Sequence, residues 1–345
     1  MKIIHSADIH LGSKIEAKLP KDKADIRKSE VRQAFNKMVS YAALHDIKVV
    51  MISGDLFDSV APLKKDKDYF YSVVRNNPDI DFIYLRGNHD SSECYSENIP
   101  ENLKTFSDEW TTYTYGHVSI SGIELTENNC KNAGYRLNLP SDTINIVMLH
   151  GQHDKLPINN LKNADYVALG HLHTFAEIES NIRGKCVYSG CLEGRGFDEA
   201  GTKGFVVVDT DKISYKFIPN SIRVIENFTI DVSKARDSYE AYKIIKNEIN
   251  TDSRNLCRIE IFGEIIFDGE YLASDIEEYL SDDYFFVYVK DETTQKSDFE
   301  QLAKENSLKG EFVRTVLASG QYTQKQKERI ISVGIKAFRG QGVLR

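Results

Sequence analysis

Five short segments of the chain carry side chains that bind hard metal ions, and each follows an apolar run. In chain order they are Asp8-x-His10, Gly54-Asp55, Gly87-Asn88-His89-Asp90, His150-Gly151 and Gly170-His171-Leu172-His173. Carboxylate, amide and imidazole groups suit Mn²⁺, Fe or Zn²⁺, and no thiolate joins them to indicate a soft-metal cluster. One Asp-x-His alone is more often a turn cap with a surface histidine. Its recurrence in a set of five favours a shared metal site.

The apolar runs that precede these segments predict the elements that position them. They are short and rich in β-branched residues, as buried strands are, and comprise Ile3-Ile4 and residues 47–53, 80–85, 143–149 and 165–169. Amphipathic stretches at residues 29–45 and 66–76 predict helices between the earlier strands. This alternation indicates an α/β core with layers. Ligands at the carboxyl ends of its strands should meet at one edge of the sheet.

Local patterns support this convergence. Asp8 and His10 are two residues apart, so on a strand they would project to the same side, whereas His5 would face the opposite side and is expected to be structural. Glycine precedes Asp55, Asn88 and His171, and a residue without a Cβ lets the backbone turn sharply into the cleft. Segments at residues 112–124, 186–189 and 203–218 are expected to form a second, more antiparallel sheet.

The five blocks resemble the signature of the calcineurin-like metallophosphoesterase superfamily. Within it, HSADIHLG at residues 5–12 and the basic stretch that follows are similar to the SbcD-type DNA-repair exonucleases. The likeness is strong for residues 1 to about 220, extends to residues 221–295 in layout, and covers residues 296–345 by position alone. It implies a four-layer αββα sandwich with a small α/β cap domain and a helical C-terminal tail.

The resemblance also implies roles for the site residues. Seven side chains would hold two divalent ions, with Mn²⁺ expected and Fe or Zn²⁺ as alternatives: Asp8, His10 and His173 for one ion, Asn88, His150 and His171 for the other, and Asp55 bridging both. His89 would lie over the scissile phosphate, and Asp90 would orient His89. Two ions about 4 Å apart can clamp the attacking and leaving oxygens of an in-line displacement.

Two further residues are candidates for substrate contact. SbcD-type proteins usually carry a Pro-Gly-Ser turn after the last block, but residues 188–199 of this chain read YSGCLEGRGFDE. In this loop Arg195 would meet a phosphate, and an ordinary structural turn is the alternative. Lys14 begins a basic stretch that continues to Lys37 beside the first block. A solvated face is the alternative for that stretch.

Length and composition predict several domains. A chain of 345 residues with 41% hydrophobic and 28% charged residues fits a globular protein of two or three domains. We expect a nuclease domain at residues 1–220, a cap domain at 221–295 and a helical tail at 296–345. The formal charge of −8 argues against a nucleic-acid partner, but residues 296–345 hold ten Lys and Arg against five Asp and Glu.

The cellular setting follows from what the sequence lacks. The five cysteines are scattered without a Cys-x-x-Cys pair, so neither a zinc ribbon nor a disulfide framework is indicated. There is no apolar stretch of membrane-spanning length, and the chain reaches its first strand without a leader-like segment. A cytoplasmic protein that does not enter membranes is therefore expected.

Two functions remain open at this stage. The first is a Mn²⁺-dependent DNA exo/endonuclease subunit, expected to be a homodimer, whose cap positions duplex DNA and whose tail docks on an SbcC-like SMC-type ATPase. The second is a stand-alone phosphodiesterase or phosphatase that acts on small phosphate esters or nucleotides, although such an enzyme does not need the last 125 residues. Apolar residues of the tail, such as Val313 and Ile331, would form a partner surface or be buried within the chain. A binding scaffold with a dead site is disfavoured because every ligand is present.

Overall fold

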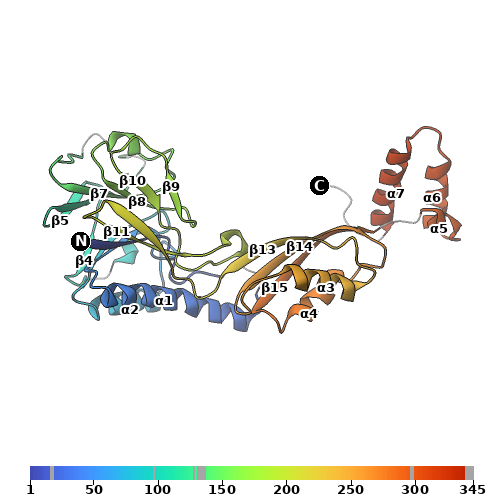
Figure 1. Cartoon of the computed structure of the whole chain (residues 1–345), viewed down its shortest axis with the longest axis horizontal. Helices are drawn as coiled ribbons and strands as arrows, with labels where there is room; N and C mark the ends of the chain where they lie inside the picture. Colours follow the sequence, from blue (N-terminus) through green and yellow to red (C-terminus); the bar gives the residue numbers. More distant parts are fainter. Residues whose placement is uncertain (16–18, 96–97, 127–128, 130–136, 296–298, 339–345) are drawn as a thin grey trace. The chain divides into compact units, whose positions relative to one another are not determined.

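The computed structural model describes residues 1–15, 19–95, 98–126, 129, 137–295 and 299–338. Contacts divide the chain into two compact units, residues 1–227 with 253–257, and residues 228–252 with 258–345 (Figure 1). The division into three domains at residues 220 and 295 stays a prediction. Among the described residues, no helix is long and apolar enough to cross a membrane.

The first unit contains two six-stranded sheets, and the first of these carries the N-terminal strand. Its order is β12-β11-β1-β2-β3-β4. The strands are β1 (Lys2–Ser6), β2 (Val49–Ser53), β3 (Asp81–Leu85), β4 (Leu103–Thr105), β11 (Gly204–Asp209) and β12 (Ser214–Pro219). Neighbouring strands from β1 to β4 are parallel, whereas β11 and β12 are antiparallel to their neighbours.

The second sheet has the order β5-β6-β7-β8-β10-β9. Its strands are β5 (Thr111–Tyr115), β6 (Val118–Gly122), β7 (Ile144–His150), β8 (Tyr166–Gly170), β9 (Ala176–Ile178) and β10 (Lys185–Tyr188). The four inner strands are parallel, and only the outer pairs are antiparallel. The expectation of a more antiparallel second sheet containing residues 203–218 is therefore wrong. Those residues form β11 and β12 and join the first sheet, because β11 pairs with β1.

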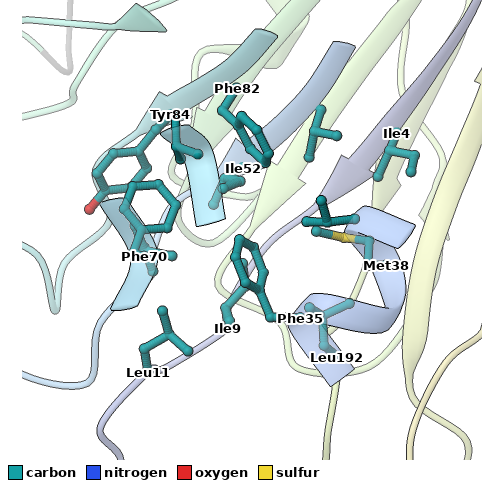
Figure 2. Close-up of a cluster of buried hydrophobic side chains, with 14 of the residues drawn as sticks. Ile4, Ile9, Leu11, Phe35, Met38, Ile52, Phe70, Phe82, Tyr84 and Leu192 are labelled. Carbon is teal, nitrogen blue, oxygen red and sulfur yellow. The ribbon is translucent and has the colours of Figure 1, made fainter. Parts of the chain in front are cut away.

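The two sheets share a core, and helices cover the other face of the first sheet. Apolar side chains of both sheets, such as Met51 and Met148, form one buried cluster. Helices α1 (Lys21–Leu44) and α2 (Lys64–Arg75) contribute to a second cluster. In Figure 2, Phe35 of α1 and Phe70 of α2 lie among strand residues such as Phe82. Burial of each such side chain stabilises the fold by about 1.5–3 kcal/mol.

The second helical layer of the expected αββα sandwich is not found in the described residues. The face of the second sheet that carries Val147 and Val167 packs against Ile158 and Leu161. These lie in the one-turn 3-10 helix Ile158–Asn160 and the segment that follows it. No α-helix is described between β4 and the second unit. The described cysteines are buried and unpaired, and Cys130 lies outside the described residues.

The second unit consists of a small sheet with two helices, followed by the tail. Its elements are β13 (Ile225–Asp231), which begins in the first unit, α3 (Ser238–Glu248), β14 (Leu256–Ile265), α4 (Leu272–Leu280) and β15 (Phe286–Gln295). The sheet order is β13-β14-β15. This alternation of strands and helices agrees with the small α/β unit expected at residues 221–295.

Three helices form the described part of the tail: α5 (Phe299–Lys304), α6 (Leu308–Ala318) and α7 (Gln324–Phe338). The outer ends of the predicted helical tail, residues 296–298 and 339–345, lie outside the described residues. Val313 and Val316 of α6 are buried against Ile331 and Ile335 of α7. The apolar faces that were expected to form a partner surface or a buried core are therefore largely covered by one another, although Val333 remains 43% exposed.

Candidate metal centre

The candidate ligands lie in loops at the carboxyl ends of five strands, drawn from both sheets. Asp55 follows β2 and Asn88 follows β3, and these strands end in register, with Ser53 opposite Leu85. In the second sheet, His150 ends β7 opposite Gly170, the last residue of β8. The ligands were predicted to meet at one edge of a single sheet. They instead follow strands of two sheets that share a core.

The first loop owes its shape to backbone pairing beyond the strand. Strand β1 ends at Ser6, so Asp8 and His10 do not share a strand face as expected. Instead, the N–H of Asp8 donates to the carbonyl of Gly54 at 3.0 Å, and the N–H of His10 donates to that of Asp55 at 3.0 Å. These bonds fasten the loop after β1 along the loop after β2.

The backbone is strained at the candidate ligands. Asp8, His10, Asp55 and His171 adopt φ angles of 51°, 51°, 50° and 108°. Only six non-glycine residues have positive φ among the residues that the structure describes, so the ligands are strongly enriched. Such conformations cost about 1–3 kcal/mol each and gather at functional sites, where the surrounding bonds hold them.

Glycine is required where the loops approach one another. Gly54 has φ +93°, and a Cβ there would lie 2.0 Å from His150 Nδ1. A Cβ at Gly87 would lie 2.2 Å from Asp55 Oδ1. The predicted reason for glycine before Asp55 and Asn88 is therefore confirmed, because a side chain would fill the space of a neighbouring ligand.

One group of ligands gathers around His10. The ligand atoms of Asp8, His10 and His173 all lie within 4.8 Å of one another. His10 Nε2 and His173 Nε2 are 3.2 Å apart. The carboxylate of Asp8 is buried and accepts the backbone N–H of His171 at 2.9 and 3.0 Å. These are the three side chains that were predicted to hold the first ion.

A second group gathers around Asn88. Its Oδ1 lies 2.9 Å from His150 Nε2 and 3.2 Å from His171 Nδ1. Asp55 Oδ2 lies 3.4 Å from His150 Nε2 and 3.9 Å from His10 Nε2. One carboxylate oxygen therefore faces both groups, which is the placement that a bridging ligand requires.

The orientation of the histidines fits a bound cation. Nδ1 of His173 lies 2.7 Å from Glu199 Oε1, and Nδ1 of His10 lies 3.0 Å from Asp58 Oδ1. A proton on each Nδ1 leaves both Nε2 atoms with lone pairs that face each other across 3.2 Å. A divalent ion between such lone pairs removes their repulsion. The nitrogen and oxygen donors suit Mn²⁺, Fe or Zn²⁺.

Charge in the cluster is strongly coupled. Burial raises the pKa of Asp8 to about 6, although the nearby His150 and His173 oppose this shift. Burial would also raise the pKa of Asp55, but its contact with His150 outweighs burial and lowers the value to about 2. The same carboxylates overcome burial at His150 and raise its pKa to about 9. Without metal, the raised pKa of His150 therefore keeps a proton on this candidate ligand at neutral pH.

His89 and Asp90 take different places in the third loop. His89 is exposed, and its ring centroid lies 5.1 Å from that of His10. Asp90 is buried and accepts backbone N–H groups of Gly87, Leu56 and Phe57 at 3.0–3.2 Å. Asp90 therefore fastens the loop that carries His89, and these bonds act on His89 through the backbone of that loop.

Three residues that surround the ligands extend the predicted site. Asp58 and Glu199 contact the ligand histidines, and neither was predicted. Arg195 was predicted to meet a phosphate, but its guanidinium contacts Asp58 Oδ1 at 2.7 Å and Glu199 Oε1 at 2.6 Å. Asp58 comes three residues after Asp55, and a second carboxylate so near a ligand block could have drawn attention. The sequence gives no comparable pointer to Glu199.

Two hollows adjoin the ligands. A cleft of about 430 Å³ is lined by Asn88, His150 and His171 together with Arg86 and Lys155. On the side of α1, a cavity of about 450 Å³ lies beside the loop after His10. Its basic lining residues are Lys14, Lys28, Arg32 and Lys65. Lys14 thus lies at the site, but next to the ligands rather than among them.

Comparison with known proteins assigns the family. A family model described as calcineurin-like phosphoesterase matches residues 1–190, more than half of the chain. The chain belongs to the calcineurin-like phosphoesterase family. The resemblance drawn from its five ligand blocks is thereby confirmed, and the phosphoesterase carries its candidate metal ligands within the matched residues.

The relatives of this phosphoesterase include DNA-repair proteins. It is 28% identical to the DNA double-strand break repair protein Mre11 of Sulfurisphaera tokodaii over 195 aligned residues. The aligned region covers 50% of this chain and 49% of that protein. Identity to Mre11 of Methanosarcina acetivorans is 25% over 88% of this chain and 52% of that protein. Identity to the SbcD component of the SbcCD nuclease of Staphylococcus saprophyticus is 27% over 64% of this chain and 69% of that protein. The chain thus spans about half the length of the two Mre11 relatives.

Among solved structures, that of TT1561 of Thermus thermophilus aligns with 63% of this chain and 98% of its own, with a TM-score of 0.44 and 13% identity. The sequence comparisons make the chain a metallophosphoesterase that is distantly related to the Mre11 and SbcD nucleases.

Proposed function

We propose that this metallophosphoesterase is a Mn²⁺-dependent DNA exo/endonuclease, the nuclease subunit of an SbcCD-like repair complex. The observation that carries the proposal is the position of Asp55 Oδ2, which faces His10 Nε2 of one ligand group and His150 Nε2 of the other. A carboxylate shared in this way supports a pair of ions in one cleft. Fe and Zn²⁺ remain alternatives to Mn²⁺.

The side chains divide the work of phosphodiester hydrolysis. When bound, two divalent ions supply Lewis acidity and an activated water. Asn88 contributes a neutral oxygen to the site, so the ligand set repels a phosphate less than another carboxylate would. His89 is exposed, its ring centroid lies 5.1 Å from that of His10, and it protonates the leaving oxygen. Asp90 holds that loop in place through its backbone bonds.

Positive charge beside the first ligand loop supports a nucleic-acid substrate. Lys28 and Arg32 of the cavity pair with Asp25 and Asp66, whereas Lys14 and Lys65 have no acidic partner among the described residues. Uncompensated lysines beside a phosphoesterase centre suit the phosphates that flank a scissile bond. The names of the DNA-repair relatives agree with this substrate.

The remaining parts of the chain receive roles on the same basis. The sheet and helices of residues 228–295 would act as a cap that positions DNA. The basic tail would dock on an SbcC-like SMC-type ATPase, and the protein would act as a homodimer. These roles rest on the relationship to the SbcD component of the SbcCD nuclease.

The test is degradation of linear duplex and hairpin DNA by the purified chain with Mn²⁺. Wild type should degrade both, and Asp55→Asn should not. Asp46→Asn is the matched control, because Asp46 also has a positive φ of 55° but is exposed, pairs with Lys48 and is not a candidate ligand. Hydrolysis of bis(p-nitrophenyl) phosphate with intact DNA would instead support an enzyme for small phosphate esters.

A further inference from the structure

The two histidines of the first ligand group are held from behind by carboxylates. Glu199 Oε1 lies 2.7 Å from Nδ1 of His173, and Asp58 Oδ1 lies 3.0 Å from Nδ1 of His10. Glu199 accepts the Nδ1 proton of His173, and a carboxylate placed in this way fixes the tautomer, orients the ring and makes Nε2 a better metal ligand. Asp58 places its negative charge beside Nδ1 of His10, in ion-pair contact without hydrogen-bond geometry. Both histidines therefore present Nε2 to the same point.

One arginine connects these two carboxylates. Arg195 Nη1 donates to Asp58 Oδ1 at 2.7 Å, and Nη2 donates to Glu199 Oε1 at 2.6 Å. The backbone N–H of Arg195 also donates to Glu199 Oε2 at 2.7 Å. The side chains of Arg195 and Glu199 are only 14% and 6% exposed. The planar guanidinium thus holds both carboxylates in fixed directions.

The second ligand group has no such arrangement among the described residues. His150 places its Nδ1 2.9 Å from the backbone carbonyl of Ser53. His171 turns Nδ1 rather than Nε2 toward Asn88, at 3.2 Å. The histidines of the second group are therefore oriented without the arginine and its carboxylates, and the two ion sites differ in what supports them.

We propose that Arg195, Asp58 and Glu199 form a positioning clamp that sets the affinity of the first ion and leaves the second ion largely unaffected. This inference rests on the proposed two-ion site. The clamp keeps His173 in the tautomer that binds metal and places a carboxylate beside Nδ1 of His10. It gives the loop at residues 188–199 a role in metal binding instead of phosphate contact. Loss of such supporting bonds typically weakens metal binding about 10–100-fold.

The experiment is stepwise Mn²⁺ binding to chelator-treated full-length protein, followed by calorimetry and by electron paramagnetic resonance. The test variants are Arg195→Gln and Glu199→Gln. Two references identify the steps, since His173→Ala removes a ligand of the first ion and His171→Ala removes one of the second. In Arg195→Gln and Glu199→Gln, the binding step that His173→Ala abolishes should have a Mn²⁺ affinity about 10–100-fold lower than in wild type. The affinity of the other step should not change.

The control is Arg183→Gln, which breaks another arginine–carboxylate pair of the same unit, between the exposed Arg183 and the buried Asp165, with Asp165 at 2.7 Å from Nε. It should change neither step. Circular dichroism establishes that each variant is folded. If Arg195→Gln does not fold, Asp58→Asn replaces it, because Asp58 lies at the more exposed end of the clamp, with its side chain 24% exposed.

The outcomes separate the clamp from the proposed function. Two ions bound by wild type with one step selectively weakened in the variants would support the clamp. Equal weakening of both steps, or no change in folded variants, would overturn the clamp and leave the two-ion site standing. A wild-type chain that binds no Mn²⁺ would overturn the two-ion site and the clamp together.

Discussion

At the scale of single residues, the first ligand block is buried, whereas His89 beside it is exposed. Asp8 and His10 are inaccessible to solvent, whereas His89 is exposed although its ring lies 5.1 Å from that of His10. A buried group can hold an ion, but only an accessible group can meet a substrate oxygen. This difference agrees with the proposed role of His89 in proton transfer and of Asp8 and His10 in ion binding.

We therefore predict that His89→Gln lowers kcat for phosphodiester hydrolysis by about 10²–10⁴-fold, the usual contribution of a general acid, without loss of metal. The measurement is steady-state kinetics together with metal content by mass spectrometry. Because His89 lies within 4.8 Å of ligand atoms of His10 and Asp58, loss of an ion from His89→Gln would show instead that it is a ligand.

The sequence predicted the residues that touch the ions better than those that support them. Asp55 and His150 stand in recognisable blocks after strands, so their chemistry was visible without the fold. Glu199 supports His173 from 26 positions away in the chain, and Arg195 reaches Asp58 across 137 positions. Contacts of this length depend on how loops fold back, which residue types and spacing do not reveal.

At the scale of elements, the site depends on how closely the loops after the strands approach one another. The loop after β2 touches His150 at the end of β7 so closely that Gly54 has no room for a Cβ. Gly116, in the turn between β5 and β6, has a comparable φ of +63° but open space around it. These two glycines separate the effect of backbone strain from the effect of contact.

Gly116→Ala should cost about 1–2 kcal/mol of the free energy of unfolding, because only the left-handed backbone is penalised. Gly54→Ala should cost more, and it should also weaken Mn²⁺ binding because its Cβ displaces the ring of His150. Denaturant unfolding and metal titration of both variants check this. Equal costs with unchanged metal affinity in Gly54→Ala would contradict the proposed packing.

His5 joins the two sheets and makes their association sensitive to acid. From β1, its Nδ1 accepts the hydroxyl of Tyr166 at 2.9 Å and its Nε2 donates to the carbonyl of Leu169 at 3.2 Å, both on β8. Burial lowers the pKa of His5 to about 3, although the carbonyl of Leu169 opposes the shift. Between about pH 3 and 6.5 the unfolded chain therefore binds the extra proton, and stability falls as the pH falls.

Between pH 7.5 and 5, wild type should lose about 2 kcal/mol of unfolding free energy through this one proton, since each pH unit below 6.5 is worth up to about 1.4 kcal/mol. His5→Gln should lack this part of the loss. Urea unfolding of metal-free protein at both pH values measures it, with the exposed His45→Gln as control. The same pH slope in wild type and His5→Gln would contradict the assignment.

Periodicity identified most elements but not their neighbours. Residues 143–149 and 203–209 both carry the apolar pattern of buried strands, yet the first belongs to the second sheet and the second pairs with β1. A strand's pattern reports burial of its faces and not its partner. The three-residue strands β4 and β9 were missed because so short a segment shows no period.

At the scale of the whole molecule, an acidic chain needs a localised basic surface to bind DNA. The formal charge is −8, so the chain as a whole repels phosphate. The cavity beside the first ligand loop offers Lys14 and Lys65 without acidic partners among the described residues. DNA affinity should therefore depend on these side chains and on salt more than on net charge.

We predict that the double variant Lys14→Ala/Lys65→Ala binds duplex DNA more weakly than wild type. Its affinity should also depend less on salt: the slope of log K against the logarithm of the salt concentration should become shallower by about 0.9 for each phosphate that is no longer neutralised. Hydrolysis of bis(p-nitrophenyl) phosphate should not change, because neither lysine is a metal ligand. Fluorescence anisotropy between about 50 and 200 mM salt, an interval over which affinity typically falls steeply, measures the slope. An unchanged slope would remove the cavity from the DNA-binding surface.

The proposed chemistry depends above all on side chains from five loops binding a pair of divalent ions. The most direct test is an anomalous difference map from crystals of the full chain soaked in Mn²⁺. We expect two peaks about 4 Å apart, one beside His10 and His173, the other beside Asn88 and His150, with Asp55 between them. A map without peaks in this cleft, or with a single peak that Asp55 does not touch, would contradict the two-ion centre.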